Sequence, residues 1–191
     1  MNTLILDRSS AMTVMAFQGR TLSLDGRDDT WVAQLKTFLQ GKRPEALAVG
    51  LGPGSFAGVR AAIACLQGLG IAWGLQPLGF PSAALLAAAS GLEDVTVVGD
   101  ARRNTLWTVR YQVTDTAITQ LGDFTLRRRD TFIPTATMVS PDAERLAQFA
   151  LPKVTLSADL LASVVQRLGS TLTPDPKPLY LHPAVGVAHA E

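Results

Sequence analysis

The stretch GLGPGSFAGVR, from Gly50 to Arg60, decides how the chain folds, because it joins two elements of different kinds. Before it, the apolar run from Ala46 to Leu51 is typical of a buried strand. After it, the segment from Phe56 to Gly74 is long, apolar and free of proline, which predicts a helix. The glycines and the proline between them predict a tight turn, with Ser55 as the helix N-cap. Strand, turn and helix in this order indicate an α/β fold.

The glycine stretch permits three interpretations. A turn that ends a strand and begins a helix is where backbone N–H groups can bind a phosphate, but Ser55 stands where a dinucleotide fingerprint needs its third glycine. A nucleotide-binding loop of the Walker type ends in Gly-Lys-Ser/Thr, and no lysine occurs between Lys42 and Lys153. The second interpretation is a structural turn with a cap. The third is a contact with another subunit, which the composition of the following helix favours.

That helix carries one charge, Arg60, and has no polar face. Its small residues fall on one side, and bulky apolar residues occupy the rest. The small ones are Gly58, Ala61, Ala62, Cys65, Gly68 and Ala72. Because small side chains let two helices pack closely, and because an apolar helix is buried nearly all round, we expect it to be covered within the domain or by a partner.

Outward from this stretch, the first half of the chain predicts a meander of three strands, then helix, strand, helix, strand and helix. The predicted strands are 4–6, 13–17, 21–24, 46–51 and 77–80, and the predicted helices are 31–39, 56–74 and 82–90. The second half predicts a similar order. Its predicted strands are 95–98, 106–111, 118–126 and 154–156, and its predicted helices are 141–149 and 158–168. The proline-rich segment from Thr173 to Pro178 is expected to run extended as a strap over the surface.

The two halves also resemble each other locally, since Asp7 and Asp100 each stand six residues before the opening of the next strand. We therefore expect an α/β protein with two similar lobes, each a mixed sheet flanked by helices, in the plan of the actin-like ATPase (ribonuclease-H-like) fold. The expected lobes are 1–91, with the glycine stretch, and 92–191, with the extended tail. Chance similarity of two α/β halves remains an alternative on pattern alone.

The amino-acid composition excludes several classes of function. Of the 191 residues, 47% are hydrophobic and 17% charged, and the net charge is +1, which is unlike a stand-alone nucleic-acid binder. The single cysteine, Cys65, excludes an internal disulfide and a cysteine-built zinc site. The N-terminus resembles a strand and not a signal peptide, and no apolar segment has the length and purity of a membrane span. We expect a cytoplasmic protein.

The glycine stretch also carries a family resemblance: GPGSFAGVR is similar to the hallmark of the bacterial TsaB (YeaZ) family, in which Thr usually replaces Ala57. Four further segments agree in order with that family. They are Ile5 to Ser10, Gly79 to Ser82, Asp100 to Arg103 and Lys177 to Leu181. The resemblance covers nearly the whole chain, which is shorter than expected of the family and carries Arg8 in place of its usual Thr. The chain is thus similar to a short, somewhat diverged member.

The resemblance implies a non-catalytic scaffold subunit of the machinery that makes N6-threonylcarbamoyladenosine at position 37 of tRNA. Its implied partners are a TsaD-type catalytic subunit and a TsaE-type ATPase, with homodimerisation when alone and tRNA contacted only indirectly. No cofactor and no metal are implied, and the family's older label, glycoprotease-like peptidase, is a name only. The implied partner interface comprises Ser55, Phe56, Val59, Arg60, Ile63, Leu66, Trp31 and Leu35. The implied remnant of a nucleotide site comprises Asp7, Ser9 and Asp100.

Two other functions stay open on the residues alone. A small ATP-binding kinase or ATPase of the same fold would use Asp7 and Asp100 to hold Mg²⁺ and phosphate, although the bulk and charge that follow Asp100 would obstruct a phosphate pocket. A homodimeric orphan of the fold is the other. His182 and His189, in the tail, form no metal-ligand pattern and leave Ser55 without a plausible base. The arginines of 127–129, with those at 102, 103 and 110, are interpreted as a solvated strand end more readily than as an RNA contact.

Overall fold

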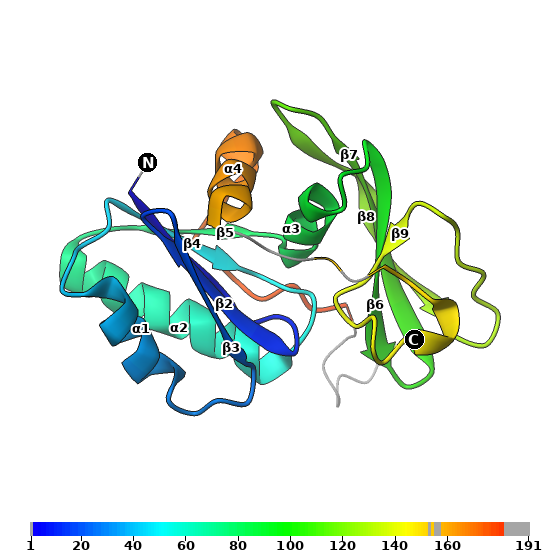
Figure 1. Ribbon diagram of the computed structural model, residues 1–191, viewed down its shortest axis with the longest axis horizontal. Helices are drawn as coiled ribbons and strands as arrows, with labels where there is room; N and C mark the ends of the chain where they lie inside the picture. The colour runs from blue at the N-terminus through cyan, green and yellow to red at the C-terminus, as the bar shows by residue number, and fades with distance from the viewer. Residues whose placement is uncertain (1, 153, 155–157, 182–191) are drawn as a thin grey trace, which may run out of the picture.

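The computed structural model describes residues 2–152, 154 and 158–181 and contains two mixed sheets with helices on their faces (Figure 1). The strands are β1 (Thr3–Asp7), β2 (Met12–Phe17), β3 (Arg20–Asp25), β4 (Ala46–Gly50), β5 (Pro77–Phe80), β6 (Asp94–Arg102), β7 (Thr105–Val113), β8 (Ile118–Arg128), β9 (Met138–Val139) and β10 (Thr173–Pro174). The helices are α1 (Trp31–Leu39), α2 (Phe56–Trp73), α3 (Ser82–Ala89) and α4 (Ala158–Leu168), with short 3₁₀ turns η1 (Ala147–Phe149) and η2 (Gly169–Thr171).

The two sheets repeat one strand order, as the sequence predicts. In the first sheet, β1, β2 and β3 form an antiparallel meander, and β4 then pairs parallel with β1. In the second sheet, β6, β7 and β8 form the meander, and β9 pairs parallel with β6. The first sheet continues through β5 to β10, giving the order β10-β5-β4-β1-β2-β3, whereas the second has the order β8-β7-β6-β9. The prediction of two similar lobes with mixed sheets is confirmed.

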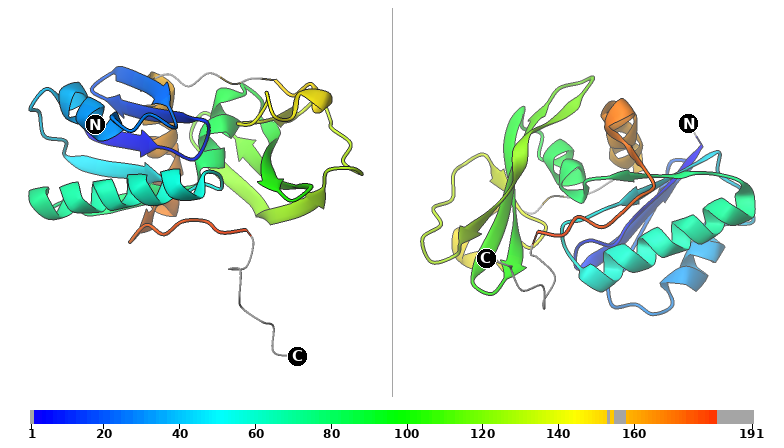
Figure 2. Two further views of the ribbon diagram at one scale, coloured as in Figure 1. Left: turned by 90° about the horizontal axis from the view of Figure 1, so that it is seen from below. Right: turned by 180° about the vertical axis from the view of Figure 1, so that it is seen from behind.

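The helices fill two layers. On the outer side of the first sheet, α1 packs against β2, and α2 packs against β1 and β4, through one apolar cluster (Figure 1). Between the two sheets, α3 and α4 lie side by side, and Figure 2 shows the same arrangement from below and from behind. A second cluster joins apolar residues of both sheets to α3 and α4, so the lobes share a core. Trp107 and Tyr111 of β7 lie in that core, 2% and 1% exposed.

Two elements of the second half differ from the prediction. The helix predicted over 141–149 is wrong: a single helical turn, in which the Leu146 N–H donates to the Asp142 carbonyl, leads into η1 and ends at Ala150 in a left-handed conformation. Leu146 is buried in a small apolar cluster to which Phe149 also packs, and the left-handed Ala150 ends the turn there. The strand beside β6 is β9; Val154 lies outside any strand, and 155–156 fall outside the described residues.

Candidate functional site

The glycine turn between β4 and α2 closes onto the loop that follows β1. A Cβ at Gly54 would overlap the carbonyl oxygen of Ser9, and a Cβ at Gly58 would overlap the carbonyl oxygen of Arg8. The Ser55 N–H donates to the same Ser9 oxygen over 2.6 Å. Glycine is therefore required at 54 and 58 because two backbone segments approach closely there.

The amides of this turn have acceptors within the protein. The Gly52 N–H donates to the Ser82 hydroxyl at 3.0 Å, and the Leu51 N–H donates to the Phe80 carbonyl at 2.9 Å. The Ser55 hydroxyl accepts from the Gly58 N–H, which makes Ser55 the N-cap of α2 as predicted. Several donors that a phosphate loop would offer to its ligand are therefore already occupied, which favours the structural turn over the anion site.

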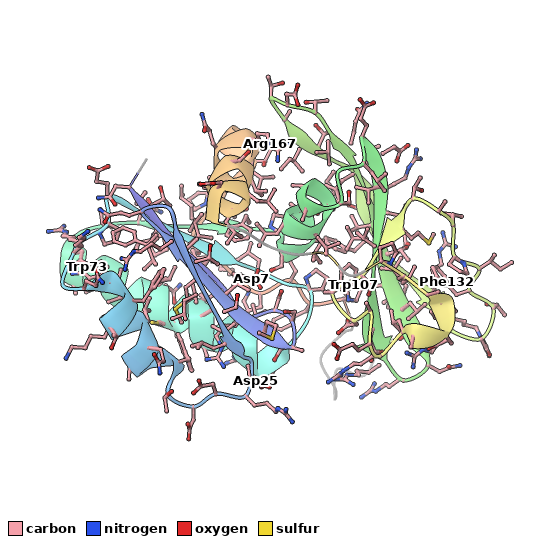
Figure 3. The ribbon with its side chains drawn as sticks, in the orientation of Figure 1. Asp7, Asp25, Trp73, Trp107, Phe132 and Arg167 are labelled. Carbon is pink, nitrogen blue, oxygen red and sulfur yellow. The ribbon has the colours of Figure 1, made fainter. Side chains whose placement is uncertain are left out.

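Asp7 lies at the end of β1, beneath this turn, and its position is labelled in Figure 3. Its Oδ1 accepts from the backbone N–H of Ser9 at 2.8 Å and from the Ser9 hydroxyl at 2.7 Å. Its Oδ2 is buried and has no hydrogen-bond partner among the described residues. The room for Oδ2 comes from Gly50, where a side chain would overlap it. Asp7 and Ser9 are thus bonded to each other.

Arg8, the departure from the family pattern, is buried between the β1–β2 loop and α1. Its Nη2 donates to the Gly26 carbonyl at 2.7 Å, and its guanidinium lies 4.3 Å from the centroid of the Trp31 ring. Burial lowers the pKa of Arg8 from its usual value. The side chain is 7% exposed, so it contributes to packing and not to a surface charge.

Asp100 occupies the corresponding place at the end of β6. Its Oδ1 accepts from the Arg102 N–H at 2.9 Å, and its own N–H donates to Asp142 Oδ2 at 2.9 Å. Burial raises the pKa of Asp142, and the Asp100 N–H opposes that rise. Among the residues the structure describes, no hydrogen bond or ion pair links Asp100 to Asp7, so the contacts of these two carboxylates remain in separate sheets.

The predicted interface residues fall into two groups. Val59, Ile63 and Leu66 of α2, with Trp31 and Leu35 of α1, are buried against the first sheet, at 0–8% exposure. These are the bulky side chains, and the sheet already covers them. The expectation that they meet a partner directly does not fit this burial. A charge at 63 or 66 would therefore disturb folding before it reported on an interface.

The remaining three predicted residues, Ser55, Phe56 and Arg60, are exposed. They begin a continuous exposed strip along α2, which we call the outer face of α2. It consists of Phe56, Ala57, Arg60, Ala64, Gly68 and Ile71. Phe56 is 61% exposed and Ile71 87%, which is unusual for apolar side chains of this size. The expectation of a helix buried nearly all round holds for one side of α2 only.

The C-terminal segment lies beside the outer face of α2. Thr173 and Pro174 form β10 beside β5, and the Leu179 N–H donates to the Leu51 carbonyl at 2.9 Å. The Tyr180 ring then lies 5.5 Å from the Phe56 ring, and the Arg60 guanidinium lies 5.1 Å from Phe56 on its own helix. Figure 2 shows this strap running along the edge of the first sheet. The predicted strap thus extends the outer face of α2 with an exposed tyrosine.

Sequence reasoning missed Ile71 and Tyr180 as exposed groups. The signal for Ile71 was present, because positions 57, 60, 64, 68 and 71 follow helical spacing on the side opposite to the buried 59, 63, 66 and 70. The signal for Tyr180 was absent, because the long-range pairing of β10 with β5 places it beside Phe56.

Groups that could act as nucleophiles or metal ligands are sparse. Burial raises the pKa of the Cys65 thiol, which keeps it protonated. Within the described residues, no three His, Cys, Asp or Glu side chains are placed to share a metal ion. His182 and His189 lie outside the described residues. By length and composition α2 could cross a membrane, but its bulky side is packed on the first sheet.

Solved structures share this architecture. YeaZ from Pseudomonas aeruginosa superimposes with a TM-score of 0.73 over 94% of this chain and 99% of its own, at 22% sequence identity. A second structure, of an uncharacterized protein from Pseudomonas aeruginosa with similarity to peptidase YeaZ, matches equally well. These likenesses confirm the expected actin-like ATPase fold.

Sequence comparisons point the same way. Uncharacterized proteins of Mycobacterium tuberculosis and Mycobacterium bovis are 33% identical over 138 residues, which is 72% of this chain. The chain spans 64% of the length of these curated relatives. A family described as "TsaD: tRNA N6-adenosine threonylcarbamoyltransferase" matches residues 36–166, more than half of the chain. The chain therefore belongs to this TsaD family, and within it resembles YeaZ (TsaB).

Proposed function

We propose that this chain is a non-catalytic scaffold subunit of the machinery that makes N6-threonylcarbamoyladenosine in tRNA, and that it docks a TsaD-type catalytic subunit with the outer face of α2. The observation that carries the proposal is the exposed apolar strip from Phe56 to Ile71 on a helix whose opposite side is fully packed. Apolar surface of this extent on a helix indicates a protein contact.

The chemistry of the strip suits a helix-to-helix interface. Ala57, Ala64 and Gly68 leave room for a second helix to approach closely. Phe56, flanked by Tyr180 and Arg60, provides an aromatic and arginine cluster of the kind that contributes most of the binding energy in protein interfaces. We expect the cluster to anchor one end of the interface and Ile71 the other.

A non-catalytic role is supported by the glycine turn. The internal hydrogen bonds of Gly52 and Ser55 and the overlap that any side chain would cause at Gly54 make this turn a clamp on the β1–β2 loop. A nucleotide phosphate would have to displace these bonds. The protonated Cys65 thiol gives no support to the peptidase label.

The test is association with the TsaD-type subunit of the same organism, measured as mass by light scattering. Ile71→Glu is expected to weaken association by at least tenfold, because a charge would be buried in an apolar contact. Ile133→Glu is the matched control: the same substitution at an isoleucine that is 81% exposed, in the loop after β8. Unchanged association of Ile71→Glu, or equal loss in both variants, would contradict the docking site.

The light-scattering measurement also distinguishes docking to a TsaD-type subunit from self-association and from binding of a TsaE-type ATPase. Self-association that Ile71→Glu abolishes, without binding to the TsaD-type subunit, would favour the homodimeric orphan. A TsaE-type ATPase is expected to join the pre-formed pair, so its recruitment is measured by adding it third.

One observation favours a second candidate, the small ATP-binding protein: the buried Oδ2 of Asp7 without a partner among the described residues. Titration with Mg-ATP by calorimetry decides between the two. Micromolar binding that Asp7→Asn abolishes would favour the nucleotide site over the scaffold.

A further inference from the structure

Arginines from two separate segments meet at one end of the second sheet. We call this group the arginine end; it consists of Arg102, Arg103, Arg127, Arg128 and Arg129. The strand register places Thr105 opposite both Arg102 and Arg128, so the three strands end at the same level. The Arg129 N–H donates to the Asn104 carbonyl at 2.9 Å, which ties the end of β8 to the β6–β7 turn. Figure 3 shows nitrogen-tipped side chains projecting from this end of the sheet.

Two of the five arginine charges there are paired with a carboxylate, and both paired side chains stay exposed. Arg102 pairs with Asp100 at 3.4 Å and Arg128 pairs with Asp130, yet the two arginine side chains are 67% and 71% exposed. Arg129 donates to the backbone carbonyl of Arg145, which leaves its charge unneutralised. Arg103 and Arg127 are exposed.

The side chains of Arg103 and Arg127 form no ion pair or hydrogen bond with another side chain or with the backbone in the described part of the chain. Guanidinium groups free to form two parallel hydrogen bonds match the oxygens of a phosphate. The arginine end therefore has two groups available for an anion, and Arg129 adds one further unneutralised charge beside them.

The backbone of the turn also favours other residues at these positions. Arg102, Arg103 and Asn104 have φ values of 66°, 50° and 59°, in the left-handed region. Glycine or asparagine adopts this region at least cost, and arginine does not. The two arginines therefore occupy places where folding alone would select smaller residues.

From these observations we infer that the arginine end binds backbone phosphates of the tRNA that the proposed machinery modifies. The identity of the RNA rests on the proposed function; the phosphate chemistry rests on the arginines. The family resemblance implies that tRNA is contacted only indirectly, and the net charge of +1 agrees with that expectation. Charge is unevenly distributed, however, and a local patch positions an RNA through its phosphates without reading its sequence.

The experiment is fluorescence anisotropy of a labelled, unmodified tRNA transcript titrated with the full chain, at 50 and 200 mM salt. The variant Arg103→Ala with Arg127→Ala is expected to weaken binding about tenfold at low salt. It is also expected to reduce the slope of log K against log salt by about 1 to 2, because each phosphate contact releases about one counterion. Arg27→Ala with Lys42→Ala removes the same charge from exposed sites beside the first sheet and is the matched control.

A single variant separates binding from folding. Arg103→Gly relieves the left-handed backbone at φ 50° and removes the guanidinium. We expect its melting temperature to stay equal or rise while its affinity for the transcript falls severalfold. A fall in melting temperature together with unchanged affinity would overturn the inference.

The other possible outcomes of these experiments also test the inference. Equal weakening by both double variants would show diffuse charge attraction and overturn the inference, as would unchanged binding in the arginine-end variant. Loss of association with the TsaD-type subunit in Arg103→Ala with Arg127→Ala would assign the patch to a protein partner instead. If the unaltered chain does not associate with that subunit, the proposed function fails, and the titration of the chain alone still decides the phosphate site.

Discussion

The turn after the first strand of each sheet contains the same carboxylate hydrogen bond in both lobes. The arginines beside that bond are buried in the first lobe and exposed in the second. Asp7 and Asp100 each accept a hydrogen bond from the backbone N–H two residues later, at 2.8 and 2.9 Å. In the first lobe the next residue, Arg8, is buried over Trp31. In the second lobe the corresponding residue is Ala101, and the arginines that follow it, Arg102 and Arg103, are exposed. One local geometry thus serves packing in one lobe and leaves charge exposed in the other.

The difference comes from what covers each sheet. The first sheet has α1 and α2 on its outer side, and the glycine turn clamps the β1–β2 loop beneath them. The second sheet has a loop and the short turn η1 on its outer side, with a small cluster around Leu146. The two lobes share their strand order, but among the described residues only the first sheet has helices on its outer side. We infer that the first lobe presents the docking helix, α2, and that the second lobe presents exposed arginines.

The largest expected effect breaks the clamp of the first lobe. Gly58→Ala places a methyl group against the Arg8 carbonyl, which is backbone and cannot move aside. We expect a loss of about 3 kcal/mol in the free energy of unfolding, measured by urea denaturation.

Gly68→Ala, in the same helix, is the matched control. Nothing lies within 4 Å of a Cβ there, so alanine is expected to raise stability by about 0.5–1 kcal/mol. Effects of the same sign in the two variants would contradict the clamp. Because Gly68 lies on the outer face of α2, the stabilised variant is also expected to bind the TsaD-type subunit more weakly.

Much of the fold was predictable because its signals are local. The strand, turn and helix around Gly50 to Arg60 combine an apolar run, glycines and a serine cap, all within a few residues of one another. The second half was predicted less well beyond β8. The two residues of β9, Met138 and Val139, have no apolar run around them, and their place beside β6 depends on a long-range pairing. The segment 141–149 has helix-forming residues, but its apolar side chains pack in a small cluster and the left-handed Ala150 ends the turn.

The orientation of α2 on the first sheet was not predictable from the sequence. The sequence showed that α2 is apolar on all sides, and such a pattern does not tell which side faces the sheet. The bulky Val59, Ile63 and Leu66 were assigned to a partner, whereas the sheet covers them. Burial of Arg8 could not be predicted, because it depends on Gly26 and Trp31, which the fold brings from 18 and 23 residues away.

An intermediate effect tests the comparison between the arginines directly. Arg8→Ala removes a hydrogen bond to Gly26, a ring contact with Trp31 and buried methylene groups, so we expect a loss of about 2 kcal/mol in stability. Arg103→Ala, at the exposed turn, is expected to change stability by less than about 0.5 kcal/mol. Thermal unfolding of both variants measures the contrast. A tolerated Arg8→Ala would show that the first-lobe loop is held by the glycine turn alone.

The smallest effect concerns the carboxylates of the second lobe. Burial raises the pKa of Asp142 in the folded protein, so the ionised form is penalised there and stability declines as pH rises through the interval between the unfolded and folded pKa values. Asp142→Asn removes that penalty and keeps an oxygen that can accept from the Asp100 N–H. We expect a small gain in melting temperature at neutral pH that disappears in acid, where Asp142 is protonated.

Asp94→Asn is the control with the opposite sign. The hydrogen bond from Arg110 lowers the pKa of Asp94, so its carboxylate contributes stability above the unfolded pKa, and that contribution is lost as pH falls. The Asn variant should therefore be slightly less stable at neutral pH and equal to the parent in acid. If Asp142→Asn followed the same course as Asp94→Asn, the carboxylate of Asp142 would stabilise the β6–β7 turn as an anion. The turns of the two lobes would then differ in their electrostatics as well as in their covering.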